Sequence, residues 1–456
     1  MKTLSPHPTF KWLCALCLGV AAISWLLRPR PETAPASSAV AVVPASQLHG
    51  NVTVWSWNIA AKSLQQLIPG FEKRHPNVHV AVDMTGARMT TRLMLSLASG
   101  VGAPDVSQFE LSDAPRYIAT GKLADLTPVA AKYRSMFPAY LWDNCMMDGK
   151  VYAIPWDMGP CAVFYKRSLF AKYGVDPQRI ETWDDYIEAG RTILRKSKGQ
   201  TKMLPLGSNA LNWMFQMLIQ QTGGQVFDGQ GRIAISSPAS RRALDIMRRL
   251  RAAGICSDVP VFSQEYLASI NADTIASYPA AVWMAGTMRD TARDYGNGDI
   301  TWGVFRLPAV ERGGKRVANV GGSVLVIPAQ CANKEAAWAF IEFALCTREG
   351  QLAQYRNFNL FPGFLPALQH PGVDDPDPFF GGQRAGGVFA TDVTQISRLN
   401  MTPQWSAAMG YVDQDLSHWA ATGMHNEGFF ENVERKLAKR LGVPVAPGNA
   451  GPRARR

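Results

Sequence analysis

Residues 51–82 read NVTVWSWNIAAKSLQQLIPGFEKRHPNVHVAV, and the spacing of their apolar residues changes twice. Apolar residues alternate over 51–57, which predicts a β-strand. They then recur at helical spacing as far as Phe71, and Pro76 marks the end of that helix. A second alternating run over 78–82 predicts another strand. This succession is a βαβ unit, so we expect parallel strands joined by a right-handed crossover.

Helices and strands continue to alternate along most of the chain. Thr182, followed by Asp185, predicts a capped helix start, and Pro238 after Ser237 predicts another. Further strands are expected at 105–109, 152–156, 162–165, 280–284 and 323–328, and further helices at 91–99 and after the cap Asn333. Such alternation, without an internal repeat of fixed period, predicts an α/β fold with mostly parallel sheets.

The composition is that of an ordinary globular protein. The 456 residues exceed one compact core and favour two or three domains, with 47% hydrophobic and 18% charged residues. The formal net charge of +11 is spread along the chain without a concentrated basic stripe. Nucleic acid is therefore not an expected partner.

The two ends of the chain differ from its body. Lys2 and Lys11 precede an apolar stretch at 12–27, so residues 1–30 are expected to be a signal peptide or a transmembrane anchor. Residues 31–50 are rich in Pro, Ala and Ser, which predicts a flexible tether. Either form of the first segment places the body outside the cytoplasm. Residues 446–456 are expected to be a disordered basic tail.

Cysteine and histidine form no metal-binding pattern. Besides Cys14 and Cys17 there are five cysteines, an odd number whose disulfide pairing the sequence does not define. The seven histidines are scattered without the spacing of metal ligands. We therefore expect neither a metal nor a cofactor.

The sequence lacks the common catalytic and nucleotide-binding motifs. Gly321-Gly322-Ser323 does not continue as a nucleophile elbow, and there is no zinc-protease, Walker A or dinucleotide-binding pattern. Two carboxylates, Glu110 and Asp157, directly follow aromatic residues near predicted strand ends. Such pairs hydrolyse glycosides or bind sugars without cutting them, and the sequence leaves both functions open.

Several short motifs resemble the family-1 extracellular solute-binding proteins, which include maltose-binding protein. They occur in order over about residues 51–441 and include APDV at 103–106, DGKVYAIP at 148–155, FYKRSLF at 164–170, TWDD at 182–185 and KEAAW at 334–338. The resemblance implies a type II periplasmic-binding fold, with a ligand cleft between two α/β lobes. By that resemblance the first lobe is 50–156 plus 325–370, and the second is 157–324 plus 371–445.

The resemblance also implies a function and a set of ligand-binding residues. The chain is expected to be the non-enzymatic substrate-binding component of an ABC carbohydrate importer. It would be a periplasmic or extracytoplasmic monomer that docks on membrane permease subunits, anchored to the inner membrane if residues 1–30 are retained. The expected ligand-binding residues are Trp57, Asn58, Phe109, Glu110, Trp156, Asp157, Trp213, Trp283, Gly321, Gly322, Arg356 and Trp405.

Three alternatives remain open at this stage. The same fold can bind a non-sugar or anionic solute, such as a glycerol phosphate, a uronate or a polyamine. An exported glycosidase would use Glu110 and Asp157. A membrane-tethered interaction protein would bind no small ligand. Trp57 and Asn58 replace a charged segment of maltose-binding protein, so the identity of the sugar also stays open.

Overall fold

The computed structural model describes residues 39–86, 89–207, 210–295, 301–425 and 427–447. The expected signal peptide or anchor at 1–30, Cys14 and Cys17, and most of the expected tail lie outside these residues. Within the described ranges, no helix is long and apolar enough to cross a membrane. The described cysteines, Cys145, Cys161, Cys256, Cys331 and Cys346, form no disulfide with one another.

The first sheet contains the predicted βαβ unit. Its strand order is β2 (Val78–Met84), β1 (Gly50–Ser56), β3 (Val106–Glu110), β12 (Ser323–Val326) and β6 (Ala153–Pro155). β1 pairs in parallel with β2 and β3, which confirms the predicted parallel strands. β12 runs antiparallel to both of its neighbours. The connecting helix α2 (Asn58–Arg74) buries Leu64, Leu67 and Phe71, the stripe that its spacing predicted.

The second sheet differs from the predicted parallel arrangement. Its order is β10 (Ser277–Ala281), β7 (Cys161–Lys166) and β11 (Trp302–Arg306), and β7 is antiparallel to both neighbours. β10 and β11 are joined through α12 (Met284–Tyr295), as a βαβ unit would be. The buried strand β7 lies between them and reverses both pairings. Local periodicity predicts each strand but does not reveal which strand inserts between two others.

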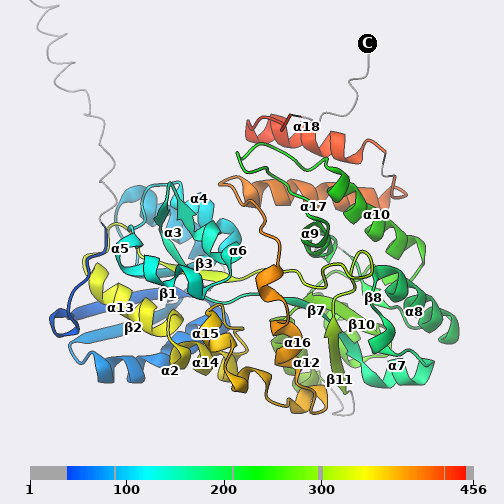
Figure 1. Ribbon diagram of the computed structural model, residues 1–456, viewed down its shortest axis with the longest axis horizontal. Helices are drawn as coiled ribbons and strands as arrows, with labels where there is room; N and C mark the ends of the chain where they lie inside the picture. Colours follow the sequence, from blue (N-terminus) through cyan, green and yellow to red (C-terminus); the bar gives the residue numbers. More distant parts are fainter. Residues whose placement is uncertain (1–38, 87–88, 208–209, 296–300, 426, 448–456) are drawn as a thin grey trace, which may run out of the picture. The chain divides into compact units, whose positions relative to one another are not determined.

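Helices cover both sheets (Figure 1). The helices of eight or more residues not yet named are α3 (Met89–Ser99), α8 (Trp183–Lys196), α9 (Ala210–Thr222), α10 (Pro238–Ala252), α11 (Gln264–Asn271), α13 (Lys334–Leu345), α14 (Arg348–Phe358), α17 (Trp405–Ala421) and α18 (Phe429–Leu441). Helices α9, α10, α17 and α18 pack together beyond the second sheet. Helices α13 and α14 contact α2 beside the first sheet.

Two predicted helix caps have different outcomes. Thr182 and Asp185 form the complete capping box at the start of α8, as predicted. Asn333 precedes α13, but its side chain makes no cap hydrogen bond. Its amide instead donates to the carbonyl of Asn51 at 3.1 Å. The side chain therefore ties α13 to β1, a long-range contact that local sequence does not indicate.

Two chain segments connect the sheets, and we call residues 156–160 and 319–323 the connecting segments. Pro160 and Asn319 form an antiparallel bridge. The Val320 amide donates to the Gly159 carbonyl at 2.9 Å. A Cβ atom on Gly159 would lie 2.0 Å from the Val320 carbonyl oxygen, so only glycine allows this approach.

The described part of the expected tether is not free. Ala39 forms a bridge with Asp125, and Val40 is fully buried. The Ala41 amide donates to Glu335 at 3.2 Å, and Leu48 is also buried. Residues 39–41 and Leu48 are therefore held on the protein, which differs at these positions from the expected flexible tether.

At the other end, the expected tail begins with residues that are also packed. Val445 forms a bridge with Ile233. Ala446 is buried, and its amide donates to the Ile233 carbonyl at 2.8 Å. The expected disorder therefore does not extend to Ala446, and residues 448–456 lie outside the described ranges.

Candidate functional site

We call the first sheet with its helices and the second sheet with its helices the two halves of the protein. A cavity of about 670 Å³ lies where these halves and the connecting segments meet. It is formed by the carboxyl ends of β1, β3 and β6 on one side and by α9, α12 and α17 on the other. Ligands of open α/β sheets bind at such strand ends. The cavity volume falls in the range of about 300–1,000 Å³ that is usual for small-molecule sites.

Ten of the twelve expected ligand-binding residues line this one cavity. They are Trp57, Asn58, Glu110, Trp156, Asp157, Trp213, Trp283, Gly321, Gly322 and Trp405. They differ in how much surface they expose to the cavity, because Trp156 and Trp405 are almost fully buried. The Trp156 indole donates to Gln354 at 2.6 Å inside the protein, which fixes the orientation of the ring. The ligand-binding role of these residues stays a prediction.

Phe109 and Arg356 do not line the cavity. Phe109 is 1% exposed, and its ring stacks on Tyr117 with centroids 4.4 Å apart. Successive residues of a strand point to opposite faces, so Phe109 enters the core while Glu110 faces the cavity. Arg356 is an exposed residue of α14, and its guanidinium lies beside Gly372. The structure therefore places neither of these two expected residues in the cavity.

The first-sheet side of the cavity is acidic and polar. Asp157 accepts a hydrogen bond from the Ser323 amide at 2.8 Å, which fixes its carboxylate. Gln108 accepts from the Ser56 hydroxyl at 2.5 Å and donates to the Ser323 hydroxyl at 3.1 Å. Glu110 is exposed to the cavity. This side therefore presents oxygen atoms that accept hydrogen bonds from ligand hydroxyl groups.

The position of Glu110 changes its acidity. Its carboxylate is open to solvent in the cavity but is surrounded by protein, and this burial raises its pKa to about 8. The nearby carboxylates of Asp157 and Asp113 raise the pKa further. Burial also raises the pKa of Asp157, against the hydrogen bonds from Ser323. A ligand hydroxyl group donated to Glu110 would stabilise its charged form.

The opposite side of the cavity is aromatic. Trp213 and Trp283 meet edge to face, with ring centroids 5.3 Å apart. Phe262 lies 6.0 Å from Trp213 and 6.4 Å from Trp283. The Trp283 indole donates to the Val320 carbonyl at 3.0 Å, which links this aromatic group to a connecting segment. Aromatic rings in such an arrangement offer faces to the C–H groups of a sugar.

Asn319 joins both halves of the chain at the base of the cavity. Its side-chain oxygen accepts from the Gly159 amide at 2.8 Å and from the Tyr140 hydroxyl at 3.2 Å. Its side-chain nitrogen donates to the Gly321 carbonyl at 2.8 Å. Its main-chain amide and carbonyl pair with the side chain of Gln220 on α9. One residue therefore holds the connecting segments to elements on both sides.

Sequence reasoning missed several lining residues, of which Gln108, Phe262 and Asn319 matter most. Gln108 and Asn319 each lie next to an expected site region, so a search of strand and segment neighbours would have found them. Phe262 lies before α11, away from any strand end. No local pattern marks it as a cavity residue.

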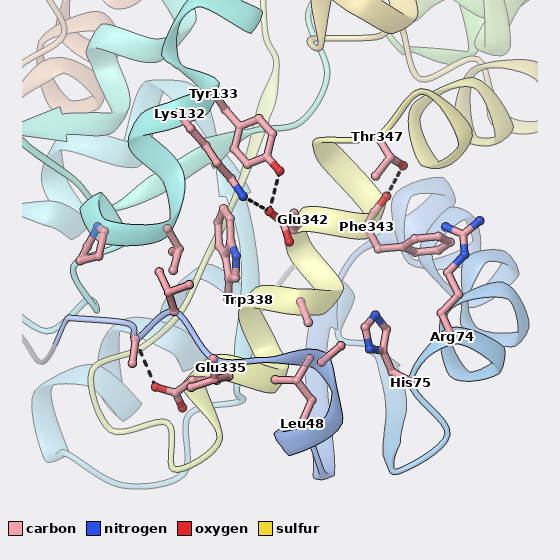
Figure 2. Close-up of a pocket in the computed structure, with 17 residues that line it drawn as sticks. Leu48, Arg74, His75, Lys132, Tyr133, Glu335, Trp338, Glu342, Phe343 and Thr347 are labelled. Carbon is pink, nitrogen blue, oxygen red and sulfur yellow. Dashed lines mark hydrogen bonds and ion pairs between the residues drawn. The ribbon is translucent and has the colours of Figure 1, made fainter.

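A second cavity of about 590 Å³ lies under residues 41–48, beside α13 (Figure 2). Two of its charged groups pair with each other: Glu342 lies 2.9 Å from Lys132 and also accepts from the Tyr133 hydroxyl at 2.5 Å. Arg74 pairs with Glu349. None of the expected ligand-binding residues lines this cavity. The cavity at the connecting segments is therefore the candidate ligand site.

No cluster of His, Cys, Asp and Glu among the described residues has the arrangement of a metal site. The charged lining residues of the candidate site are Glu110 and Asp157, and Asp157 is held by the Ser323 amide. The lining therefore offers hydrogen-bonding groups and aromatic side chains.

Two known proteins are similar to this chain in sequence. The chain is 28% identical over 310 residues to an arabinooligosaccharide-binding protein of Bacillus subtilis, covering 66% of this chain and 70% of the relative. It is 25% identical to a lactose-binding protein of Rhizobium radiobacter, covering 82% and 89%.

A solved structure has the same two-lobe α/β architecture. It is the ABC transporter associated binding protein from B. animalis subsp. lactis Bl-04 in complex with β-1,6-galactobiose. The TM-score is 0.70 at 26% identity, and the match covers 87% of this chain and 99% of that one. The family model for bacterial extracellular solute-binding proteins matches residues 55–348, most of the described chain. The chain therefore belongs to the bacterial extracellular solute-binding proteins.

Proposed function

We propose that this chain is the substrate-binding component of an ABC-type carbohydrate importer and binds a saccharide in the cavity at the connecting segments. The observation that carries the proposal is the pairing of an aromatic wall, Trp213 and Trp283, with a wall of hydrogen-bond acceptors that includes Glu110. Sugars have both apolar C–H faces and hydroxyl donors, so they match both walls. Relatives that bind arabinooligosaccharides and lactose support the same ligand class.

The charges of the cavity favour a neutral ligand over an anionic one. Among the described residues that line it, the charged side chains are Glu110 and Asp157, and none is Lys, Arg or His. An anion would meet two acidic side chains and no compensating cation, although the whole chain carries +11. This argues against a uronate or a glycerol phosphate as the ligand.

A polyamine is the second candidate. Carboxylates and aromatic faces also bind ammonium groups, and Glu110 lies in a cavity that contains Trp57, Trp213 and Trp283. The sugar-binding relatives favour the carbohydrate, and a direct comparison of the two ligand classes decides between them.

Binding would work through closure of the two halves. A ligand that contacts both walls favours the closed form only by the difference of its affinities for the closed and open forms. The Ser406 hydroxyl of α17 donates to Asp113 next to β3 at 2.6 Å, so the two walls already touch at this point. The closed form would then dock on permease subunits and release the sugar to them.

The remaining expectations complete the proposal. The protein would act outside the cytoplasm as a monomer, with residues 1–30 removed or retained as an inner-membrane anchor. It would not turn its ligand over. The family is one of solute-binding proteins, and this supports a binding role without a catalytic step.

The test is a binding screen with product analysis. The purified protein, beginning at residue 39, is titrated with lactose, an arabinooligosaccharide, β-1,6-galactobiose, galacturonate, glycerol phosphate and spermidine. A rise in melting temperature and a calorimetric signal with a neutral saccharide, and an unchanged saccharide after a day, support the proposal. Binding of spermidine or an anion alone overturns the carbohydrate assignment, and release of free sugar overturns the non-enzymatic role.

A further inference from the structure

Phe262 is an unusual residue in an unusual conformation. It is 49% exposed. Among the described residues, the other large hydrophobic side chains that are exposed are not aromatic. It lines the candidate cavity next to Trp213 and Trp283. Removing an apolar ring of this size from water lowers the free energy of the system. Its exposure inside a cavity therefore points to a bound ligand that covers it.

The backbone at Phe262 is strained. Its φ angle is +65°, in the left-handed region that glycine and asparagine occupy most readily. For a bulky residue this conformation is an outlier, and such outliers persist only where surrounding structure imposes them. Here Ser263 caps α11 by accepting from the Tyr266 amide, which fixes the chain directly after Phe262.

A purely structural role would leave a different pattern. A residue before a helix cap often packs on the helix to fix its entry, and that contact buries the side chain. Phe262 does lie 6.2 Å from Tyr266, in an edge-on contact. However, its other recorded ring neighbours, Trp213 and Trp283, belong to the cavity wall, and the residue as a whole stays 49% exposed.

We propose that Phe262 is a ligand-positioning residue, whose exposed ring face receives one sugar unit beside Trp213 and Trp283. This inference rests on the proposed function and extends it to a residue outside the expected site. The strained backbone holds the ring in the cavity before the ligand arrives, so little side-chain freedom is lost on binding. The ligand class is a saccharide with an apolar C–H face.

The test distinguishes the effect of the aromatic ring on affinity from the effect of the strained backbone on stability. Phe262→Ala removes the ring and keeps a side chain at positive φ, whereas Phe262→Gly removes both the ring and the strain. Phe262→Trp keeps an aromatic face. Leu95→Ala, at a 66% exposed position of α3 outside the cavity, is the matched control. Affinities for lactose, the arabinooligosaccharide and β-1,6-galactobiose are measured by calorimetry, and melting temperatures are measured without ligand.

We expect Phe262→Ala and Phe262→Gly to lose about tenfold in affinity, the Trp variant to stay within about threefold of wild type, and Leu95→Ala to be unchanged. The unliganded Gly variant should melt no lower than wild type. Affinity within twofold of wild type in both truncated variants overturns the inference, as does a Gly variant that melts well below wild type. If wild type binds none of these saccharides, the proposed function itself fails, and the inference fails with it.

Discussion

The indole N–H of Trp283 donates a hydrogen bond to the main-chain carbonyl of Val320 at 3.0 Å. Trp283 belongs to the aromatic wall of the cavity, and Val320 belongs to a connecting segment. The position of the ring is therefore coupled to a segment that the proposed closure of the two halves would move.

Trp283→Phe tests this coupling. It keeps an aromatic side chain but removes the N–H, so the Val320 carbonyl loses its partner at a cost of about 1 kcal/mol. We expect saccharide affinity to fall about fivefold in calorimetry. Trp302→Phe, at a buried strand position away from the cavity, is the control and should leave affinity unchanged. Equal affinity of Trp283→Phe and wild type would argue against the coupling.

Glu110→Gln should alter the pH dependence of stability. In the unfolded chain the pKa of Glu110 is near 4.5, and in the folded protein it is raised to about 8. Between these values the folded protein keeps a proton that the unfolded chain has lost. Its free energy of unfolding therefore falls as pH rises through this window.

The expected result is a melting temperature of Glu110→Gln that gains on wild type from about pH 5 to about pH 8 and stays level above it. Glu188→Gln, an exposed position of α8, is the control and should show no such trend. A constant difference between Glu110→Gln and wild type across the window would contradict the raised pKa. Above about pH 8, where Glu110 is charged, the same variant should bind the saccharide about tenfold more weakly, since it loses a charged acceptor.

Gly159→Ala should destabilise the protein. A Cβ atom would lie 2.0 Å from the Val320 carbonyl oxygen, so the pairing of the connecting segments must open. Overpacking of this kind costs about 1–3 kcal/mol, which thermal unfolding detects as a drop of several degrees.

Gly410→Ala is the matched control for that substitution. Gly410 lies within α17, and a Cβ atom there meets nothing within 4 Å. Alanine in an exposed helix is more stable than glycine by up to about 1 kcal/mol. The two glycine variants should therefore shift the melting temperature in opposite directions, and shifts of the same sign would refute the packing argument.

Ser406→Ala should speed the release of ligand. The Ser406 hydroxyl of α17 donates to Asp113 next to β3 at 2.6 Å, and a closed form without this hydrogen bond loses about 1 kcal/mol. We expect stopped-flow fluorescence to show dissociation about fivefold faster. Ser406→Thr keeps a hydroxyl group and should release ligand at nearly the wild-type rate. The same rate in the Ala and Thr variants would mean that the contact has no part in closure.

Local patterns predicted the elements better than their pairing. The stripe ending at Phe71 and the capping box at Thr182 depend on residues within a few positions of one another, and the structure confirms both. The insertion of β7 between β10 and β11 depends on contacts far apart in the chain. Periodicity carries no information about such contacts.

The candidate site shows the same division. Strand ends led to Glu110 and Asp157, because polar residues after strands of one sheet gather at one edge. Arg356 followed only from the family resemblance, and its helix turns it away from the cavity. Phe262 depends on how a loop enters α11, which a backbone angle reveals and the sequence does not.

The two described ends of the chain are fastened to different halves of the protein. Ala39 is held by Asp125 near the first sheet, and Val445 is held by Ile233 near α10 and α18. A donor dye at Ala39 and an acceptor dye at the exposed Pro447 would therefore be attached to different halves without entering the cavity. Energy transfer between them would report closure directly, so this receptor offers a ready frame for a reagentless optical sensor of its own ligand.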